Sequence, residues 1–183
     1  MSPDKADAKA QAVLDIALEQ VGFIPNMYAN MVNAPAVLDT YLLGYRRFRE
    51  ESGFSPAEQE VVFLTISFEN ECEYCMGAHS FIADKKSRVP AGVTDAIRAG
   101  EEIPDPKLAA LAEFTRAMVR KRGLPGIEDA RAFKSAGYEE RHMLYIVLAI
   151  SVKTLSNYSN HLFQTRLDER FASRTWTSSK RSE

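Results

Sequence analysis

The chain contains little cysteine or histidine, little net charge and no long apolar run. Only two cysteines and three histidines occur among its 183 residues. No segment reaches the ~18 consecutive apolar residues that a membrane-spanning helix needs. The formal net charge of −2 gives no electrostatic attraction to nucleic acid or to an anionic membrane surface. We therefore expect a protein with no nucleic-acid and no membrane partner.

Sequence motifs of several enzyme classes are also absent. No glycine-rich phosphate-binding loop precedes a helical segment, so the sequence does not indicate a nucleotide site. No G-x-S-x-G or H-E-x-x-H motif occurs. The first residues, Met1 to Asp7, lack the apolar core of a signal peptide. We expect a cytoplasmic location, where a lone cysteine pair is more often catalytic or metal-binding than a structural disulfide.

Apolar residues repeat at helical spacing along most of the chain, and strand-like alternation is scarce. The clearest start signal is Ser55 with Pro56 and Glu58, which suit the cap, the first helical position and a capping box. We expect helices over residues 4–21, 26–32, 35–52, 56–69, 71–85, 93–98, 107–122, 127–135 and 138–167, with a break in the last near Asn157. The sequence thus predicts an all-α fold, with one compact multi-helix domain over residues 1–172 and a flexible C-terminal tail over residues 173–183.

A weak internal similarity suggests a helical repeat. The stretch Cys72-Glu-Tyr-Cys75 is echoed by Ser156-Asn-Tyr-Ser159, and a histidine follows each of them, His79 or His161. The two histidine offsets differ by two residues. The polar side chains of the second stretch could line a pocket or cap a kink in the last helix.

The two cysteines and His79 have the spacing of one helical stripe. Residues at i, i+3 and i+7 share a helix face, so Cys72, Cys75 and His79 are expected to lie together. The thiolate is the reactive form of cysteine, and a helix N-terminus favours it at Cys72 and, less strongly, at Cys75. His79 can reach the Cys75 sulfur directly or through one water. This pattern favours thiol–disulfide chemistry.

Glu60 could orient His79 as the third member of a nucleophile–base–orienter set. On one continuous helix, however, Glu60 and Cys72 would lie about 18 Å apart. Glu60 can join the site only if the chain turns at Glu69-Asn70-Glu71, so that two helices lie side by side. The charged residues at that position permit such a turn.

Metal binding is an alternative for the same residues. Cys72, Cys75 and His79 are ligand types that zinc accepts, and His142 or His161 could supply a fourth. A second C-x-x-C or H-x-x-x-H pair is absent, which counts against a zinc site.

The pattern Glu60-x11-Cys72-x-x-Cys75-x3-His79, on an all-helical chain, resembles the alkyl hydroperoxidase D-like proteins of the carboxymuconolactone decarboxylase superfamily. The match is tightest over residues 55–83. The stretches Gly22-Phe-Ile-Pro-Asn-Met and Thr154-Leu-Ser-Asn-Tyr-Ser-Asn-His161 also resemble its peroxidase-related branch.

The resemblance implies a compact all-α fold, an enzyme that needs no cofactor, and a homo-oligomer, often a trimer or hexamer. The apolar run from Met143 to Leu155 fits an oligomer or a central core helix. By the same resemblance, Glu60 and His79, with water, would deprotonate a cysteine. Cys75 would then attack a small-molecule hydroperoxide or a partner disulfide, and Cys72 would resolve the product as a disulfide.

One departure from the family pattern concerns Tyr74, because the hydroperoxidase carries a histidine between its cysteines. Tyrosine forms hydrogen bonds but is a weak base near neutral pH, so we expect Tyr74 to change how the relay is tuned. The sequence predicts a thiol-dependent peroxidase or disulfide reductase, reduced by a thiol protein or a low-molecular-weight thiol. The alternatives are lactone processing of the decarboxylase type, which needs no cysteine pair, and a redox-sensing or ligand-binding oligomer.

Overall fold

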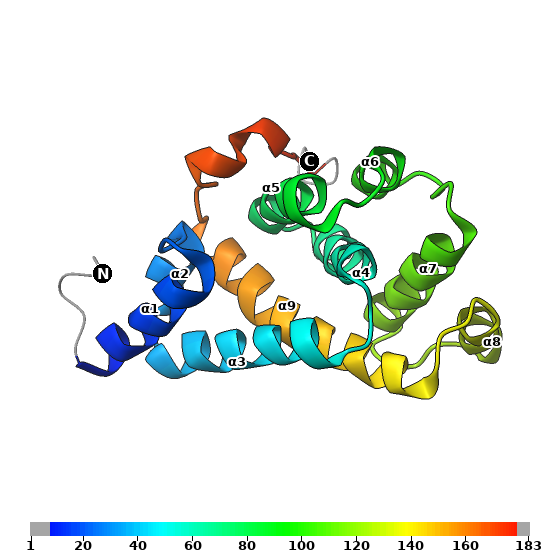
Figure 1. Ribbon diagram of the computed structural model, residues 1–183, viewed down its shortest axis with the longest axis horizontal. Helices are drawn as coiled ribbons and strands as arrows, with labels where there is room; N and C mark the ends of the chain where they lie inside the picture. Colours follow the sequence, from blue (N-terminus) through cyan, green and yellow to red (C-terminus); the bar gives the residue numbers. More distant parts are fainter. Residues whose placement is uncertain (1–7, 179–183) are drawn as a thin grey trace.

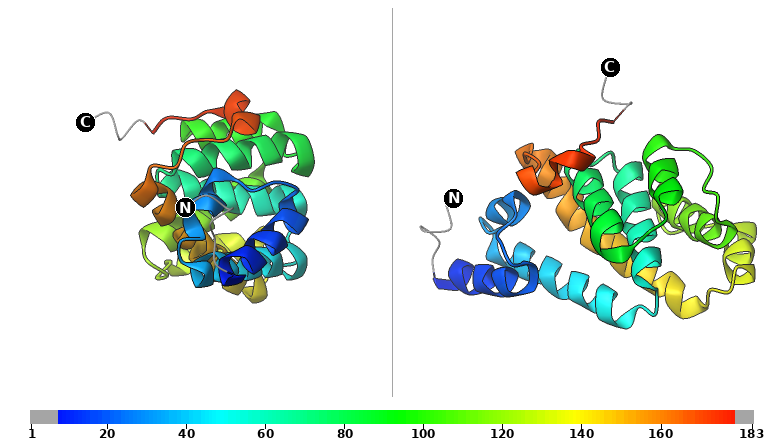
Figure 2. Two further views of the ribbon diagram at one scale, coloured as in Figure 1. Left: turned by 90° about the vertical axis from the view of Figure 1, so that its left-hand side faces the viewer. Right: turned by 45° about the horizontal axis from the view of Figure 1, so that its top comes forward.

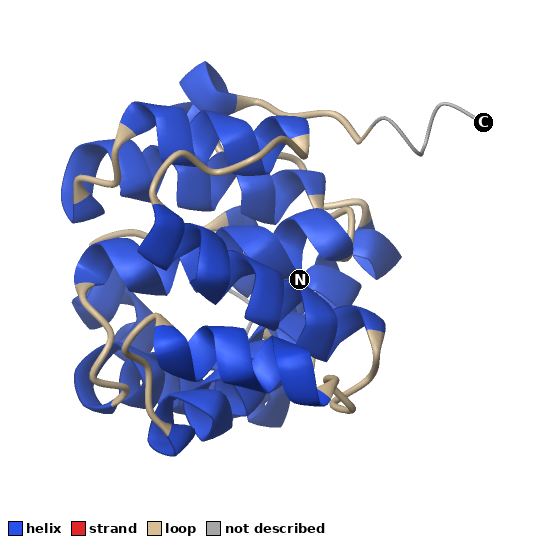
Figure 3. Ribbon diagram, turned by 90° about the vertical axis from the view of Figure 1, so that its right-hand side faces the viewer, coloured by secondary structure: helices blue, strands red, loops and turns tan. Residues whose placement is uncertain are grey.

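The structure, a computed structural model, describes residues 8–178, and every regular element in that range is helical (Figure 1; Figure 3). The predicted all-α class is therefore confirmed. The α-helices are α1 (Ala8–Val21), α2 (Asn26–Met31), α3 (Pro35–Glu51), α4 (Pro56–Glu69), α5 (Glu73–Ile82), α6 (Ala91–Ala99), α7 (Pro106–Arg120), α8 (Ile127–Ser135) and α9 (Glu140–Phe163). A π-helical turn, η2 (Ala83–Ser87), extends α5, and a 3-10 helix, η3 (Glu169–Arg174), follows α9. Within this range no helix combines the length and apolar character of a membrane crossing.

Helices α4, α5 and α9 lie in the middle of the molecule (Figure 1). Helices α1 and α2 are at one end, α7 and α8 are at the other, and α3 runs along one side. The further views show η3 lying over α5, on the opposite side from α1 and α3 (Figure 2). The middle helices are thus covered from several directions, and the residues between them are shielded from water.

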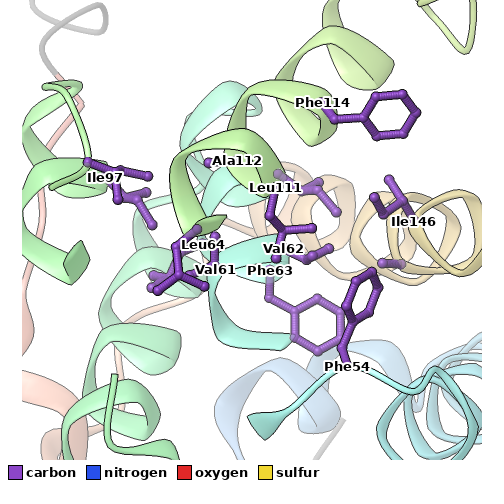
Figure 4. Close-up of a cluster of buried hydrophobic side chains, with 14 of the residues drawn as sticks. Phe54, Val61, Val62, Phe63, Leu64, Ile97, Leu111, Ala112, Phe114 and Ile146 are labelled. Carbon is purple, nitrogen blue, oxygen red and sulfur yellow. The ribbon is translucent and has the colours of Figure 1, made fainter. Parts of the chain in front are cut away.

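Helix α4 is buried on almost every face because it runs through the centre of the core. Its residues from Glu58 to Ser67 are all buried. Val61, Val62 and Leu64 lie among side chains from α6, α7 and α9 (Figure 4). A second apolar cluster joins α1, α2 and α3 to the cysteine-bearing start of α5. The cysteines therefore lie at the edge of a packed core.

The predicted start of α4 is confirmed in detail. The Ser55 Oγ accepts a hydrogen bond from the Glu58 backbone N–H at 3.3 Å, and the Glu58 carboxylate accepts one from the Ser55 N–H at 2.8 Å. Pro56 occupies the first helical position. This capping box satisfies two N–H groups that a helix start leaves without partners, and it fixes where Glu60 lies along α4.

The chain turns sharply between α4 and α5, at the place where the sequence permits a turn. Glu71 has a φ of 56°, in the left-handed region that costs a residue with a Cβ roughly 1–2 kcal/mol. The Cys72 N–H donates to the Ser67 carbonyl at 2.9 Å, which closes the turn. Helix α5 then begins at Glu73 with Cys72 as its N-cap residue. Because α5 folds back beside α4, Glu60 comes close to residues that follow the cysteines.

The predicted break near Asn157 is wrong, because α9 is one continuous helix from Glu140 to Phe163. The Asn157 side-chain oxygen accepts a hydrogen bond from Asn70 Nδ2 at 2.9 Å. The amide therefore ties α9 to the turn between α4 and α5 instead of capping a kink.

Residues 173–178, which the sequence assigns to a flexible tail, pack against α6 and α4. The Arg98 guanidinium donates to the carbonyls of Arg174 at 3.1 Å and Thr175 at 2.9 Å. The Trp176 indole donates to the Arg98 carbonyl at 2.9 Å, and its ring centroid lies 5.8 Å from that of Phe68. The remainder of the expected tail, residues 179–183, lies outside the described residues.

Candidate functional site

The two thiols lie at the start of α5, buried against α9. Both cysteines are free and buried. The Asn160 amide Nδ2, on α9, lies 3.3 Å from the Cys75 Sγ and 3.8 Å from the Cys72 Sγ. The Ser156 hydroxyl, one turn earlier on α9, lies 4.0 Å from the Cys75 Sγ. Ser156, which parallels Cys72 in the sequence echo, thus lies beside the other cysteine, Cys75.

Glu60 and His79 form a buried pair. The Glu60 Oε2 lies 2.8 Å from the His79 Nδ1. The other carboxylate oxygen accepts a hydrogen bond from the Arg49 guanidinium, which also donates to the Tyr45 hydroxyl at 2.7 Å. The expectation that Glu60 approaches His79 across a turn therefore holds in the geometry. Arg49 and Tyr45, both on α3, extend the hydrogen bonds of this pair. The sequence pattern did not indicate either residue.

The charges of this pair fix the protonation of the His79 ring. Burial raises the pKa of Glu60, but Arg49 and His79 outweigh burial and lower it to about 2. An ionised carboxylate only accepts hydrogen bonds, so the His79 Nδ1 must carry the proton. Burial, together with the positive charge of Lys153, lowers the pKa of His79, which keeps its ring neutral near pH 7. The His79 Nε2 is then free to accept a proton.

Lys153, on α9, lies at this site and was missed by the sequence reasoning. Lys153 is 0% exposed, and within residues 8–178 its Nζ has no hydrogen-bond partner. The nitrogen lies 5.5 Å from the Phe63 ring centroid, and the Arg49 guanidinium lies 4.9 Å from the same ring. A buried ammonium is costly without a compensating anion, by several kcal/mol. A lysine within the apolar run of α9 was the signal in the sequence that could have identified it.

The positive charge of Lys153 favours the thiolate form of Cys75. Burial raises the pKa of Cys75, but the adjacent Cys72 thiol and the charge of Lys153 outweigh burial and hold the pKa well below its ordinary value. Burial raises the pKa of Cys72 well above its ordinary value, and the negative charge of Cys75 adds to that effect. Position at the helix N-terminus alone favours the thiolate at Cys72. In the structure the surroundings reverse that order and favour the thiolate at Cys75.

Two cavities lie on the two sides of the thiol pair. The Cys75 cavity, of about 380 Å³, is lined by Cys75, His79, Lys153, Arg49, by the tyrosines 28, 41, 45 and 74, and by further residues of α1 to α5, η2 and η3. The Cys72 cavity, of about 260 Å³, is lined by Cys72, Glu73, Tyr74, Asn160, His161, Gln164 and Thr165. Tyr74 borders both of them, whereas each cysteine borders only one.

Tyr74 divides the two cavities and cannot replace the histidine of the family pattern as a base. Its hydroxyl donates to an Asp168 carboxylate oxygen at 2.5 Å, and the other Asp168 oxygen accepts from the Asn26 N–H at 3.1 Å. Burial and the Asp168 charge raise the pKa of Tyr74, so the hydroxyl keeps its proton. Tyr74 therefore ties α5 to the chain before η3 and holds the wall between the cavities.

The predicted site residues are brought together, whereas the candidate zinc ligands are not arranged around one metal position. Glu60, Cys72, Tyr74, Cys75 and His79 all lie at this site. The other two candidate zinc ligands, His142 and His161, lie in different parts of the structure. His142 packs against Phe54 and Tyr138 at the far end of α9, and His161 lies beside Cys72. Among the described residues, no group of three or more His, Cys, Asp or Glu side chains is arranged to hold a metal ion.

Comparison with known proteins identifies the fold. The chain matches no protein-family model and no curated protein. It is similar to an alkylhydroperoxidase AhpD-core, peroxidase-related protein from Ralstonia eutropha JMP134, with a TM-score of 0.78 and 20% identity over 93% of this chain and 91% of that one. A peroxidase-related protein from Silicibacter sp. TM1040 is similar with a TM-score of 0.75 and 19% identity, over 93% of this chain and 90% of that one.

A third similar structure holds a brominated ring. It is the debrominase Bmp8, in a cysteine-to-alanine variant bound to 2,3,4-tribromopyrrole, with a TM-score of 0.73 and 14% identity over 91% of this chain and 89% of that one. These identities establish the fold and leave the reaction to be argued from the site. The chain has the alkylhydroperoxidase AhpD-like fold.

Proposed function

We propose that this protein is an enzyme, a thiol-dependent peroxidase or disulfide reductase that cycles between a dithiol and a disulfide at Cys72 and Cys75. The feature that supports the proposal is a pair of neighbouring thiols whose surroundings favour the thiolate at Cys75 and the protonated form at Cys72, with Cys75 at the wall of a cavity. Cys75 is matched to the charge of Lys153, and Cys72 stands three residues away with a raised pKa. A thiolate attacks, and a neighbouring thiol resolves.

The reaction begins in the Cys75 cavity. The Cys75 thiolate attacks the terminal oxygen of a hydroperoxide, the O–O bond breaks, and the sulfur becomes a sulfenic acid while an alkoxide leaves. The Lys153 ammonium, whose thiolate partner has been consumed, donates a proton to the alkoxide and gives the alcohol. The charges of Cys75 and Lys153 thus disappear together, and no unpaired charge stays buried.

Cys72 completes the oxidation. Its sulfur attacks the sulfenic sulfur of Cys75, the disulfide forms, and water leaves. The neutral His79 ring accepts the Cys72 proton, directly or through water, and passes it to the departing hydroxide. Glu60 and Arg49 hold the ring in the tautomer that leaves Nε2 available. A thiol reductant then restores both cysteines by exchange.

The direct test is the mass and the free-thiol count of the reduced protein before and after one equivalent of hydroperoxide. Loss of about two mass units and of both thiols, reversed by dithiothreitol, is the expected result. A steady-state assay with excess dithiothreitol should then show repeated consumption of hydroperoxide. Cys75→Ser is the control, and turnover in that variant at the wild-type rate would contradict the proposal. Disulfide formation without repeated turnover would favour a redox sensor instead.

The aromatic lining of the Cys75 cavity favours a second candidate, reductive removal of bromine from an aromatic ring. The hydroxyphenyl rings of Tyr28, Tyr41 and Tyr45 line this cavity together with Cys75, and flat rings pack well against aromatic side chains. The Cys75 thiolate would attack the bromine while the ring carbon takes a proton. Cys72 would then displace bromide and form the disulfide. Bromide release from 2,3,4-tribromopyrrole by the reduced protein tests this candidate, and one equivalent of bromide for each disulfide is expected.

We also propose that the protein forms a homo-oligomer through exposed apolar residues of α9. Leu144 is 73% exposed and Leu162 is 78% exposed, and Val147, Tyr158 and Phe163 on the same helix are also exposed. Exposed apolar residues in this number are typical of an interface. Light scattering on the purified protein should give a trimer or a hexamer, and a monomer at all concentrations would contradict the proposal.

A further inference from the structure

The Cys72 cavity has no part in the oxidation step, yet it ends at one of the two sulfurs. The hydroperoxide reaches Cys75 through the other cavity, which Cys72 does not line. The Cys72 cavity instead places Cys72 beside Asn160 and His161 of α9. Both of these residues carry a buried polar atom, the Asn160 Oδ1 and the His161 Nε2, that has no hydrogen-bond partner within residues 8–178. Buried polar atoms without partners are rare in folded proteins, and here both belong to residues that line a cavity.

We propose that a reducing thiol enters the Cys72 cavity and attacks the Cys72 Sγ of the disulfide, so that oxidant and reductant reach the thiol pair from opposite sides. This inference rests on the proposed dithiol–disulfide cycle. It assigns the reductant a site of its own and a specific target sulfur.

The direction of exchange follows from the difference between the sulfurs. In thiol–disulfide exchange, the sulfur with the lower thiol pKa leaves faster. The surroundings of Cys75 hold its pKa low and those of Cys72 hold its pKa high. An attack on Cys72 therefore expels Cys75 as the thiolate beside Lys153, whereas an attack on Cys75 would expel the poor leaving group. The reductant must reach Cys72, and the cavity at Cys72 provides the access.

The exchange balances in two steps. The His161 Nε2 takes the proton of the entering thiol, whose sulfur bonds to Cys72 as the Cys72–Cys75 bond breaks. That proton passes on to Lys153, so that the ammonium faces the departing Cys75 thiolate. A second thiol then attacks the entering sulfur, and His161 transfers the proton of this second thiol to Cys72 as Cys72 leaves. The products are one disulfide of the reductant and the dithiol form of the protein.

The size and the lining of the cavity indicate what enters. A volume of about 260 Å³ is at the low end for a small-molecule site, so the cavity admits the thiol-bearing arm of its carrier and no bulky group. The polar lining suits a polar carrier. A low-molecular-weight thiol and a thiol arm presented by a protein share this chemistry, and the test separates them.

The test starts from protein in which the disulfide has been made with diamide, so that it does not depend on a peroxidase activity. The reduction is stopped with acid during reaction with glutathione, and the site of the mixed disulfide is mapped by mass spectrometry of peptides. Glutathione on Cys72 is the expected result, and glutathione on Cys75 would overturn the proposal. Failure of hydroperoxide to form a disulfide would count against the proposed function alone.

Substitution of His161 tests its role as the base in the reduction step. His161→Gln should slow reduction by about 10-fold or more, and most for thiols of high pKa, because a thiol that is already ionised needs no base. The oxidation rate should not change. His142→Gln is the matched control on the same helix, since glutamine suits the capping position that His142 occupies. Equal losses for thiols of low and high pKa would contradict the role of His161 as a base.

Two filling substitutions separate the entrances. Thr165→Trp in the Cys72 cavity should slow reduction by glutathione and leave oxidation by hydroperoxide unchanged, and Val21→Trp in the Cys75 cavity should do the reverse. Reduction of wild-type protein by glutathione, dithiothreitol and a thioredoxin-type dithiol then identifies the source of the thiol. Equal rates of reduction in wild type and Thr165→Trp for all three reductants would overturn the proposed entrance.

Discussion

Cys75 and Cys72 stand three residues apart in one helical turn, yet their surroundings differ in charge. The Cys75 side contains Lys153 and His79, and behind them the ion pair of Glu60 and Arg49. The Cys72 side is formed mainly by neutral polar groups. Burial and nearby charge, more than position along a helix, therefore decide which thiol is favoured as the thiolate.

The largest effect is expected from a substitution of His79, which lines the Cys75 cavity. His79→Gln keeps a hydrogen-bond donor for the Glu60 carboxylate but removes the base. We expect disulfide formation to slow by about 10²- to 10⁴-fold, the usual contribution of a general acid or base. Stopped-flow measurement of thiol loss after mixing with hydroperoxide tests this. A rate within a factor of three of wild type would remove His79 from the mechanism.

Glu60→Gln tests the ion pair behind His79. The substitution leaves the buried Arg49 charge without its carboxylate, and we expect the free energy of unfolding to fall by about 3–5 kcal/mol. The matched control is Glu51→Gln, which breaks a solvent-exposed pair with Arg47 and should cost about 0–1 kcal/mol. Urea unfolding measures both variants. Equal losses of unfolding free energy in the two variants would contradict the stabilising role of the Glu60–Arg49 pair.

The same carboxylate predicts how stability depends on pH. The pKa of Glu60 is about 2 in the folded protein, lower than the ordinary 4.5. A lowered pKa stabilises the fold above pH 4.5, and this contribution is lost as the pH falls from there towards 2. Unfolding measured across this pH range should show the loss in wild type and a smaller loss in Glu60→Gln. Parallel curves for the two proteins would contradict the low pKa.

Lys153→Met tests the difference between the sulfurs most selectively. Methionine keeps the apolar volume and removes the charge, so we expect the pKa of Cys75 to rise and its alkylation by iodoacetamide near pH 7 to slow by about 10- to 100-fold. Stability should stay equal or increase, because a buried ammonium is removed. The pH profile of alkylation and a urea unfolding curve give both results. An unchanged alkylation profile would show that the Lys153 charge does not lower the pKa of Cys75.

The smallest effect is expected for Tyr74, which lies between the two sides. Tyr74→Phe removes the hydrogen bond to Asp168 and should cost about 1 kcal/mol of stability. The pH profile of Cys75 alkylation should not move, since the hydroxyl keeps its proton in the folded protein. A shifted profile would show that Tyr74 belongs to the proton relay.

The sequence predicted the fold class and the cysteine stripe well because both depend on local patterns. The capping box at Ser55 and the i, i+3, i+7 spacing from Cys72 to His79 are short-range features. The sequence permits a turn at Glu71 but does not predict one, because the left-handed backbone there depends on packing. The break at Asn157 was predicted from a polar residue whose partner, Asn70, is 87 positions away.

The charged residues of the site were harder to predict than the thiols. Arg49 lies on α3 among other arginines, and nothing local distinguishes it from a solvent-exposed residue. Lys153 gave a signal, a charge within an apolar helix, but its proximity to Cys75 depends on how α9 packs against α5. The difference between the two sulfurs is thus a tertiary property.

The central claim, that Cys75 is the nucleophile and Cys72 the resolving thiol, is tested most directly by trapping the sulfenic acid. Cys72→Ser and Cys75→Ser are each treated with one equivalent of hydroperoxide in the presence of dimedone, and the adducts are located by mass spectrometry of peptides. The account predicts a dimedone adduct on Cys75 in Cys72→Ser and none in Cys75→Ser. An adduct on Cys72 in Cys75→Ser, formed at an equal or greater rate, would contradict it.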